Sequence, residues 1–196
     1  MFDFKSKASR QLLVLGALTF NVWGIAHGAP LTLKTTVTDI SGKTQRLPTP
    51  GQKATVLVFI AHDCPISNAY APEISRIVAD YAKRGVRFLV AYAESDFNVV
   101  GARKHARAYG FQVPIILDSK FRLSHAAGAT VTPEVAILAP DGHNLYRGRI
   151  DNRFVSYGKK RAQPSQRDLR DALDAIVAGR PVPHPTTTAI GCFIPE

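Results

Sequence analysis

Residues 54–67 read Ala-Thr-Val-Leu-Val-Phe-Ile-Ala-His-Asp-Cys-Pro-Ile-Ser, and this stretch decides the fold. Residues 55–61 are continuously apolar, β-branched or aromatic, which indicates a buried central strand. A helical pattern follows, so Cys64 lies at a junction between a strand and a helix. The partial positive charge of a helix N-terminus stabilises a thiolate and lowers the pKa of the thiol. We therefore expect thiol chemistry at Cys64.

The segments around this junction complete an α/β pattern. Residues 67–84 form an expected helix, because Ile74, Ile77, Val78 and Tyr81 share one helical face and Gly85 can end it. The other expected helices are 98–109, 121–127 and 165–178, and the other expected strands lie in 31–47, 86–93, 113–117, 134–138 and 144–150. This order predicts a mixed central sheet flanked by helices, with an N-terminal β-hairpin and a closing antiparallel hairpin.

The start of the last helix carries a further local signal. Ser165 followed by Asp168 resembles an acidic version of the capping box, in which the two side chains satisfy backbone N–H groups of the first turn. We therefore expect Ser165 to cap this helix.

The first 28 residues have the pattern of a signal peptide. Three basic residues precede the apolar run 12–22, and small residues at Ala26 and Gly28 fit a cut after Gly28. A cut after Ala26 fits the same rule, and an uncleaved membrane anchor is the alternative, although the run is short for a spanning helix. We expect residues 1–28 to be removed and the protein to be exported, to a periplasmic or extracellular location.

The composition is that of a soluble globular protein, with 45% hydrophobic and 20% charged residues in a chain of 196. We expect one domain over residues 29–179 and a Pro-rich tail over residues 180–196 that is extended and poorly packed. Loss of residues 1–28 would change the formal net charge from +10 to +8, because three basic residues and one acidic residue leave. No nucleic-acid motif accompanies this charge, so we expect no nucleic-acid partner.

Three features together resemble the thioredoxin-like superfamily. They are Cys64 and Ser67 in a Cys-Pro-x-Ser motif, Pro72 eight residues after Cys64, and Thr132-Pro133 before the closing hairpin. Residues 38–42 and 98–117 are similar to the redoxin branch, which contains exported thioredoxin-like proteins and the alkyl hydroperoxide reductase/thiol-specific antioxidant group. The resemblance covers nearly all of residues 29–179 and implies a thioredoxin-like fold.

The resemblance also implies roles for individual residues. Cys64 would be the attacking thiolate, and Ser67 can donate a hydrogen bond that holds the pKa of Cys64 down. Pro133 would follow a cis peptide bond beside Cys64 and leave the backbone of Thr132 free to pair with an extended substrate strand. His62 would tune the pKa of the thiol. The alternatives are that Pro133 is only a turn residue and that Cys64 is a buried, inert cysteine.

The sequence departs from the best-known members of this superfamily at three positions. Ser67 stands in place of the second cysteine of a Cys-x-x-Cys pair, and Val58 in place of the buried acid of thioredoxin. Ala61 stands where peroxiredoxins have Thr or Ser to position a peroxide, and a methyl group cannot bond to a peroxide oxygen. The chemistry of a dithiol thioredoxin is therefore not expected, and a peroxidase reaction would be weakly assisted.

Cys192, the second cysteine of the chain, is the candidate resolving thiol. At about 3.3 Å per residue, an extended tail from Arg180 can reach across a small domain to Cys64. Residues 190–194 are apolar for a loose tail, which favours docking. The alternatives are a disulfide with another molecule or a free thiol.

A metal site around His62 and Cys64 is an alternative, completed by one of the residues His125, His143, His184 or Cys192. Cys and His suit copper and zinc, but the paired cysteines of thioredoxin-like copper carriers are absent here. We therefore expect neither a metal nor a cofactor.

The favoured hypothesis is an exported thiol-disulfide oxidoreductase acting on protein or small-molecule thiols and disulfides. The alternatives are a peroxiredoxin-like enzyme that reduces hydroperoxides, and a carrier of copper or another metal.

Overall fold

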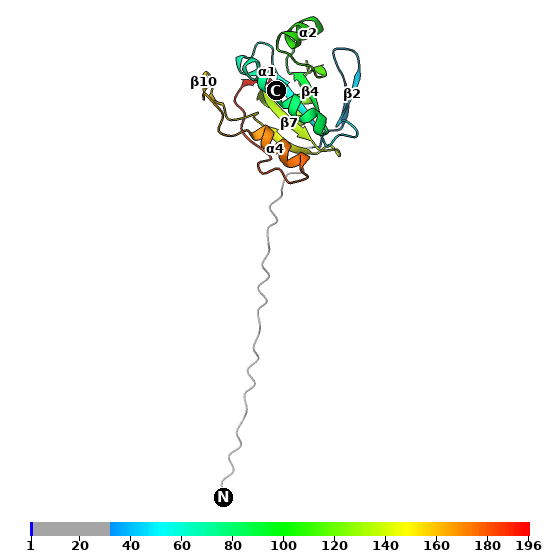
Figure 1. Ribbon diagram of the computed structural model, residues 1–196. Helices are drawn as coiled ribbons and strands as arrows, with labels where there is room; N and C mark the ends of the chain where they lie inside the picture. The colour runs from blue at the N-terminus through cyan, green and yellow to red at the C-terminus, as the bar shows by residue number, and fades with distance from the viewer. Residues whose placement is uncertain (2–31) are drawn as a thin grey trace.

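A five-stranded mixed sheet forms the centre of the computed structural model, which describes residue 1 and residues 32–196 (Figure 1). In spatial order the strands are β5 (Ile115–Leu117), β4 (Val86–Tyr92), β3 (Ala54–Ile60), β7 (Glu134–Leu138) and β8 (Asn144–Gly148). The first three strands are parallel to one another, whereas β7 and β8 run antiparallel to their neighbours. The expected mixed sheet and closing hairpin are confirmed.

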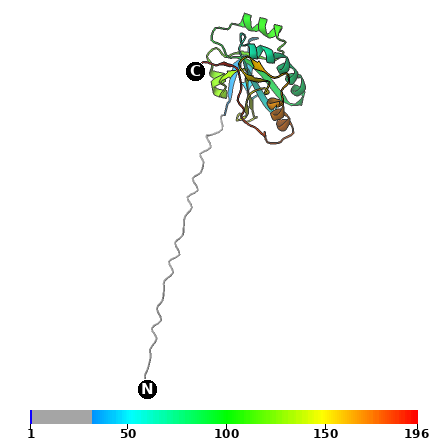
Figure 2. The same cartoon turned by 90° about the vertical axis from the view of Figure 1, so that its left-hand side faces the viewer.

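Both faces of this sheet are covered, which explains the continuous apolar run of β3. Val56, Val58 and Ile60 pack on the face that carries α1 (Pro65–Tyr81) and α4 (Asp168–Val177). Leu57 and Phe59 point to the opposite face and pack with α3 (Arg122–Ala127). Figure 2 shows α3 on one side of the sheet and α1 and α4 on the other. All seven residues of β3 are therefore buried.

The remaining elements lie around this core. They are β1 (Thr35–Thr38), β2 (Thr44–Leu47), a short 3-10 helix η1 (Ala82–Arg84), α2 (Val99–Ala108), β6 (Val131–Thr132), β9 (Phe154–Ser156), β10 (Lys159–Lys160) and β11 (Cys192–Phe193). Strands β1 and β2 pair antiparallel and form the expected N-terminal hairpin. In the described ranges, residue 1 and residues 32–196, no helix is both long enough and apolar enough to span a membrane. Apart from Met1, the predicted signal peptide lies outside the described residues.

Helix α1 begins two residues earlier than the sequence pattern suggests. Cys64 is its N-cap residue, and Pro65 is the first helical residue, where a missing N–H group costs the helix nothing. Pro72 lies inside the helix, which continues to Tyr81 before η1. Gly85 then takes a left-handed conformation with φ of 88°, so it ends the helical segment as predicted.

The capping box predicted at the last helix is wrong. The N-cap residue of α4 is Arg167, and its side chain makes no capping hydrogen bond. Ser165 instead accepts a hydrogen bond from Asn152, and the Asp168 carboxylate accepts two hydrogen bonds from Arg149. The two side chains that the local pattern expected to cap the helix therefore form hydrogen bonds with residues from other parts of the fold.

The C-terminal tail is extended and mostly exposed, as expected, but part of it is docked on the domain. Strand β11 pairs antiparallel with β6. The backbone N–H of Thr187 donates to the carbonyl of Arg147 on β8 at 3.0 Å, and the N–H of Arg147 donates to the carbonyl of Pro185 at 2.9 Å. Ile194 is buried in the core layer beneath α3. The prolines remove backbone donors only at their own positions, so the residues between them remain free to pair.

Candidate active site

Cys64 lies where β3 ends and α1 begins, and its side chain is fully buried. Its Sγ atom is 2.6 Å from the Sγ atom of Cys192 and 3.1 Å from the backbone carbonyl oxygen of Thr132. The two cysteines are free thiols, and they are 128 positions apart in the sequence. Three segments therefore meet at this sulfur atom: the strand-to-helix junction, the loop before β7, and the tail.

The surroundings of Cys64 act on its pKa in opposite directions. Burial alone would raise the pKa, because it disfavours the charged thiolate. Hydrogen bonds from the Cys192 thiol, the Ser67 hydroxyl and the backbone N–H groups of both residues outweigh it and lower the pKa below its ordinary value. The carbonyl of Thr132 is a partner for the protonated form only, since it can accept but cannot donate. The net effect favours the thiolate.

Ser67 is placed to supply one of these hydrogen bonds. It is buried in the first turn of α1, and its Oγ atom accepts a hydrogen bond from the Ala61 backbone N–H at 3.4 Å. Because that bond uses a lone pair, the hydroxyl proton remains free to point at the Cys64 sulfur. The same hydroxyl is thus oriented by the end of β3 and directed at the thiol.

The pKa of the Cys192 thiol is shifted in the opposite direction, above its ordinary value. Burial, the hydrogen bond to Cys64, and the negative charges of Cys64 and Asp63 all raise the pKa of the Cys192 thiol. Unlike Cys64, Cys192 is partly exposed. The pair therefore consists of a buried sulfur, Cys64, that favours the thiolate form, and a more exposed sulfur, Cys192, that keeps its proton. The Cys192 thiol donates a hydrogen bond to the Cys64 sulfur.

The loop before β7 has the geometry that the resemblance implies at Pro133. The Thr132–Pro133 peptide bond is cis, and Thr132 is buried against Cys64. Its backbone, however, is not free for a substrate, because Thr132 is paired with Cys192 between β6 and β11. The tail therefore occupies the edge of Thr132 in this structure, and the pairing of Thr132 with a substrate strand stays a prediction. The apolar tail residues that flank Cys192 dock at this strand themselves.

Glu134 supports this loop and was missed from the sequence. It is buried at the start of β7, and its carboxylate accepts hydrogen bonds from the backbone N–H groups of Thr130 and Val131. An acidic residue in an otherwise apolar strand is the signal that could have identified it, because a buried carboxylate needs donors.

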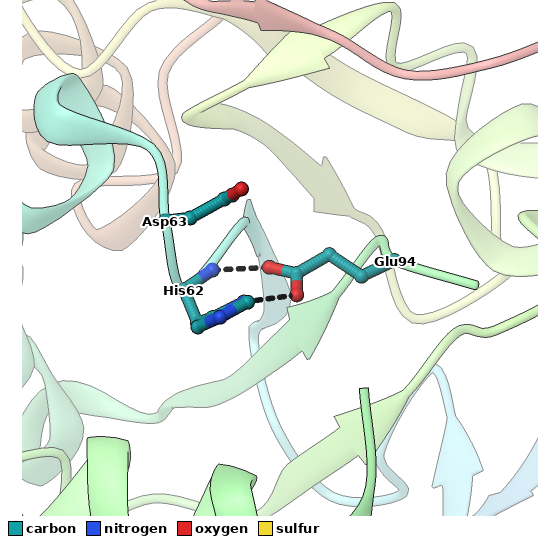
Figure 3. A group of neighbouring side chains, drawn as sticks. All are labelled: His62, Asp63 and Glu94. Carbon is teal, nitrogen blue, oxygen red and sulfur yellow. Dashed lines mark hydrogen bonds and ion pairs between the residues drawn. The ribbon is translucent and has the colours of Figure 1, made fainter. Parts of the chain in front are cut away.

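His62 lies at the rim of the site and does not contact the thiols. Glu94 accepts from the backbone N–H of His62 and lies 2.5 Å from the ring Nδ1 atom, as Figure 3 shows with dashed lines. The ring stacks on Phe97, with centroids 4.2 Å apart and planes 11° from parallel. None of the interactions that shift the pKa of Cys64 comes from His62. The role of His62 in tuning the thiol therefore stays a prediction without a direct contact behind it.

A second group of polar side chains connects this rim to α2. The ring of His105 lies 2.7 Å from the Tyr92 hydroxyl and 3.0 Å from the Asn68 side-chain oxygen, and Asn68 also donates to the His62 carbonyl. Burial is the main cause that lowers the pKa of His105. Sequence reasoning missed these residues and Glu94. Glu94 follows β4, and parallel strands place their carboxyl ends at one edge of a sheet, so its position next to the end of β3 could have been inferred.

The residues of the alternative metal site around His62 and Cys64 do not come together as one group. His125 contacts the Pro195 carbonyl, and His143 pairs with Asp141. Among residue 1 and residues 32–196, the one group with metal-ligand spacing is His62, Asp63 and Glu94, whose ligand atoms lie within 4.8 Å of one another (Figure 3). Both carboxylate oxygens of Glu94 already bond to His62, which accounts for this arrangement without an ion.

Comparisons with solved structures support the fold. An uncharacterized conserved protein from Geobacillus kaustophilus is 28% identical, with a TM-score of 0.73, and the match covers 85% of this chain and 92% of that one. A hypothetical protein from Sinorhizobium meliloti 1021 is 23% identical, with a TM-score of 0.74 and coverage of 84% and 92%. A secreted Mycobacterium tuberculosis disulfide oxidoreductase homologous to E. coli DsbE is 20% identical, with a TM-score of 0.50 and coverage of 74% and 95%.

No curated protein matches the chain. The sequence matches the AhpC/TSA family over residues 27–146, which is more than half of the chain and includes Cys64 and the cis-proline loop. The tail that carries Cys192 lies beyond this match. The chain thus belongs to the AhpC/TSA family, and it is an oxidoreductase of the thioredoxin-like redoxin group.

Proposed function

We propose that this protein catalyses thiol–disulfide exchange, with Cys64 as the attacking thiolate and Cys192 as the resolving thiol. The observation that carries the proposal is the contact between the two sulfur atoms, 2.6 Å apart. A disulfide bond is about 2.05 Å long, so only a small movement separates this contact from a bond. The second cysteine of a thioredoxin Cys-x-x-Cys pair cannot resolve the disulfide here, because Ser67 stands in its place.

The reaction has two exchange steps. The Cys64 thiolate attacks one sulfur of a substrate disulfide R–S–S–R′, forms Cys64–S–S–R and releases R′–S⁻. Cys192 loses its proton and attacks the Cys64 sulfur, which forms the Cys64–Cys192 disulfide and releases R–S⁻. The substrate gains the two electrons that the two thiols lose.

The first step also prepares Cys192 for the second. The hydrogen bond to Cys64 and the negative charge of Cys64 are two of the causes that raise the pKa of Cys192. Both disappear when the Cys64 sulfur becomes part of a neutral mixed disulfide. The resolving thiol therefore ionises more readily once it is needed.

Replacement of each cysteine in turn tests this assignment. Cys64→Ser should abolish the exchange of electrons with a model disulfide, whereas Cys192→Ser should stop at a stable adduct on Cys64. Mass spectrometry of the oxidised protein, digested without reduction, should find a Cys64–Cys192 peptide in the unsubstituted chain. Exchange that survives in Cys64→Ser at the original rate, or oxidised protein without that peptide, would contradict the proposal.

Reduction of hydroperoxides is the second candidate function, and membership of the AhpC/TSA family favours it. The peptide N–H of Ala61 is already bonded to Ser67, and the Ala61 methyl group offers no hydrogen bond to a peroxide. Peroxide consumption that requires Cys64 and rises strongly in Ala61→Thr would support this candidate. Consumption that is equal in Cys64→Ser would exclude it.

Export is part of the proposal. It is supported by the signal-peptide pattern of residues 1–28 and by the fold shared with a protein described as secreted. The mass of the full chain expressed with its own N-terminus should correspond to cleavage after Gly28 or Ala26. Recovery of a chain that begins at Met1 from the membrane fraction would indicate an uncleaved anchor instead.

A further inference from the structure

The tail closes the site over Cys64. None of the Cys64 surface is exposed, although the thioredoxin-like position at a helix N-terminus lies at the edge of the sheet. Strand β11 lies along β6 in register Cys192 to Thr132, on the strand that a bound extended peptide would use. A second strand cannot occupy the same hydrogen-bonding edge of β6. The docked tail and an extended substrate therefore exclude each other.

Cys192 remains accessible from the other direction. It lines a pocket of about 410 Å³, whose walls include His62, Phe97, Phe121 and Phe193. Cys64 does not contribute to this pocket. Phe193 is 89% exposed at its mouth. A small thiol that enters from solvent therefore meets the Cys192 sulfur first.

We propose that the docked tail separates the two half-reactions in space: an external thiol reduces the oxidised protein by attacking Cys192, and Cys64 meets a disulfide substrate only after the tail leaves β6. This inference rests on the proposed function, since it requires a Cys64–Cys192 disulfide as the oxidised state. It goes further by stating which sulfur the reductant attacks and what must move.

The reductive step balances with an external thiolate R–S⁻ as the electron donor. Its sulfur bonds to Cys192, the Cys64–Cys192 bond breaks, and Cys64 leaves as a thiolate. A second external thiolate then attacks the sulfur of R in the R–S–S–Cys192 adduct, which yields R–S–S–R and the Cys192 thiolate. The Ser67 hydrogen bonds that lower the pKa of Cys64 remain available in this step and make Cys64 the better leaving group.

The tail is held weakly enough to move. Strand β11 has two residues, and near the thiols the tail is held by this pairing, by the Ile194 backbone hydrogen bond to Thr130 at 2.9 Å, by the buried Ile194 side chain and by the contact of His125 with the Pro195 carbonyl. Short segments with few buried contacts open locally at a small fraction of the global free energy of unfolding. The core around β3 can therefore stay folded while the tail leaves.

Gly191 offers a way to displace the tail without touching a cysteine. A Cβ atom at this position would collide with the backbone carbonyl of Thr132, and backbone atoms of a paired strand cannot move aside. Gly191→Ala should therefore push β11 off β6. The matched control is Thr188→Ala, because Thr188 is an exposed residue of the same tail.

The first experiment measures the access of reagents to Cys64 in a Cys192→Ser background, where Cys64 is the one thiol left. Iodoacetamide should alkylate Cys64 about tenfold faster or more in Gly191→Ala, because the tail opens more often. Thr188→Ala should keep the original rate. A chain that ends at Ala189 gives the rate for a site without β11, and circular dichroism verifies that each variant is folded. An equal alkylation rate in all four proteins would overturn the role of the tail.

The second experiment identifies the sulfur that the reductant attacks. The oxidised, otherwise unsubstituted chain is treated with a limiting amount of 2-mercaptoethanol and quenched in acid, and the freed thiol is labelled with a maleimide. Peptide mapping should find 2-mercaptoethanol on Cys192 and maleimide on Cys64. The reverse distribution would overturn the inference while leaving the proposed function intact. Failure of the two cysteines to form a disulfide at all would overturn both.

Discussion

The two cysteines of this protein belong to regions that are held in very different ways. Cys64 is positioned by β3, which is buried on both faces of the central sheet, and by α1, which packs on one of these faces. Cys192 is positioned by a two-residue strand at the end of an extended tail, which the core holds mainly through Ile194 near the thiols. One sulfur is thus part of the core, and the other is docked against it.

Under the proposed function, this difference makes one site both stable and open to exchange. The core supplies the Ser67 hydrogen bonds that lower the pKa of Cys64, and these persist unless the domain unfolds, whereas the Cys192 hydrogen bonds that also lower it come from the tail. The tail supplies the second thiol and can leave by local opening. Substitutions in the two regions should therefore have different consequences.

The largest expected effect is on global stability, from a substitution in the core region. Ile74 is buried on the face of α1 that covers β3. Ile74→Ala should lower the free energy of unfolding by about 2–5 kcal/mol, because it removes buried methyl groups and leaves a cavity. Urea unfolding under reducing conditions measures this change. A loss below about 0.5 kcal/mol, the range of surface substitutions, would mean that α1 is not part of the cooperative core.

A smaller effect is expected for the equivalent change in the tail. Ile194→Ala removes similar buried contacts, but the tail can undock before the domain unfolds. The urea midpoint should change little, while alkylation of Cys64 in the Cys192→Ser background should become several-fold faster, roughly as local opening becomes easier. If Ile194→Ala instead shifts the urea midpoint as strongly as Ile74→Ala, the tail is part of the core and the comparison fails.

The smallest effect is expected for the hydroxyl group that stabilises the Cys64 thiolate. Ser67→Ala removes one of the hydrogen bonds that lower the pKa of Cys64, so the pKa should rise and less thiolate should be present at any pH below it. The pH profile of alkylation should move to higher pH, and the rate on its acidic side should fall about two- to tenfold for the loss of one hydrogen bond. Ser67→Cys is not a neutral control, so Ser75→Ala serves instead, because Ser75 is a half-buried serine of the same helix whose hydroxyl donates to the Gly110 carbonyl and not to a thiol. An unchanged profile would remove Ser67 from the site.

Much of the fold could be predicted because its signals are local and repeated. The buried strand at residues 54–60, the helical face of Ile74 and Ile77, and the glycine stop at Gly85 each follow from short-range patterns of side chains. The capping box at Ser165 failed for the opposite reason. Both of its side chains found partners, Asn152 and Arg149, which are more than ten residues away in the chain.

The candidate site divides in the same way. Cys64, Ser67 and the Thr132–Pro133 loop could be identified from motifs, whereas Glu94 and His105 join the site only because neighbouring strands and helices bring them to one edge of the sheet. His62 was identified from its place in the sequence next to Cys64, yet its ring turns to Glu94 and Phe97. Proximity along the chain did not determine where that side chain points.

The sequence by itself determined that a thiol stands at a strand-to-helix junction and that no second cysteine follows within one helical turn. Whether the distant Cys192 meets that thiol was decided by the tertiary structure. The apolar residues 190–194 favour docking of the tail, but they have no pattern from which the place of docking could be deduced. The contact depends on β6 presenting an unpaired backbone edge and on Gly191 lying close against Thr132, and both conditions exist only once the domain has folded.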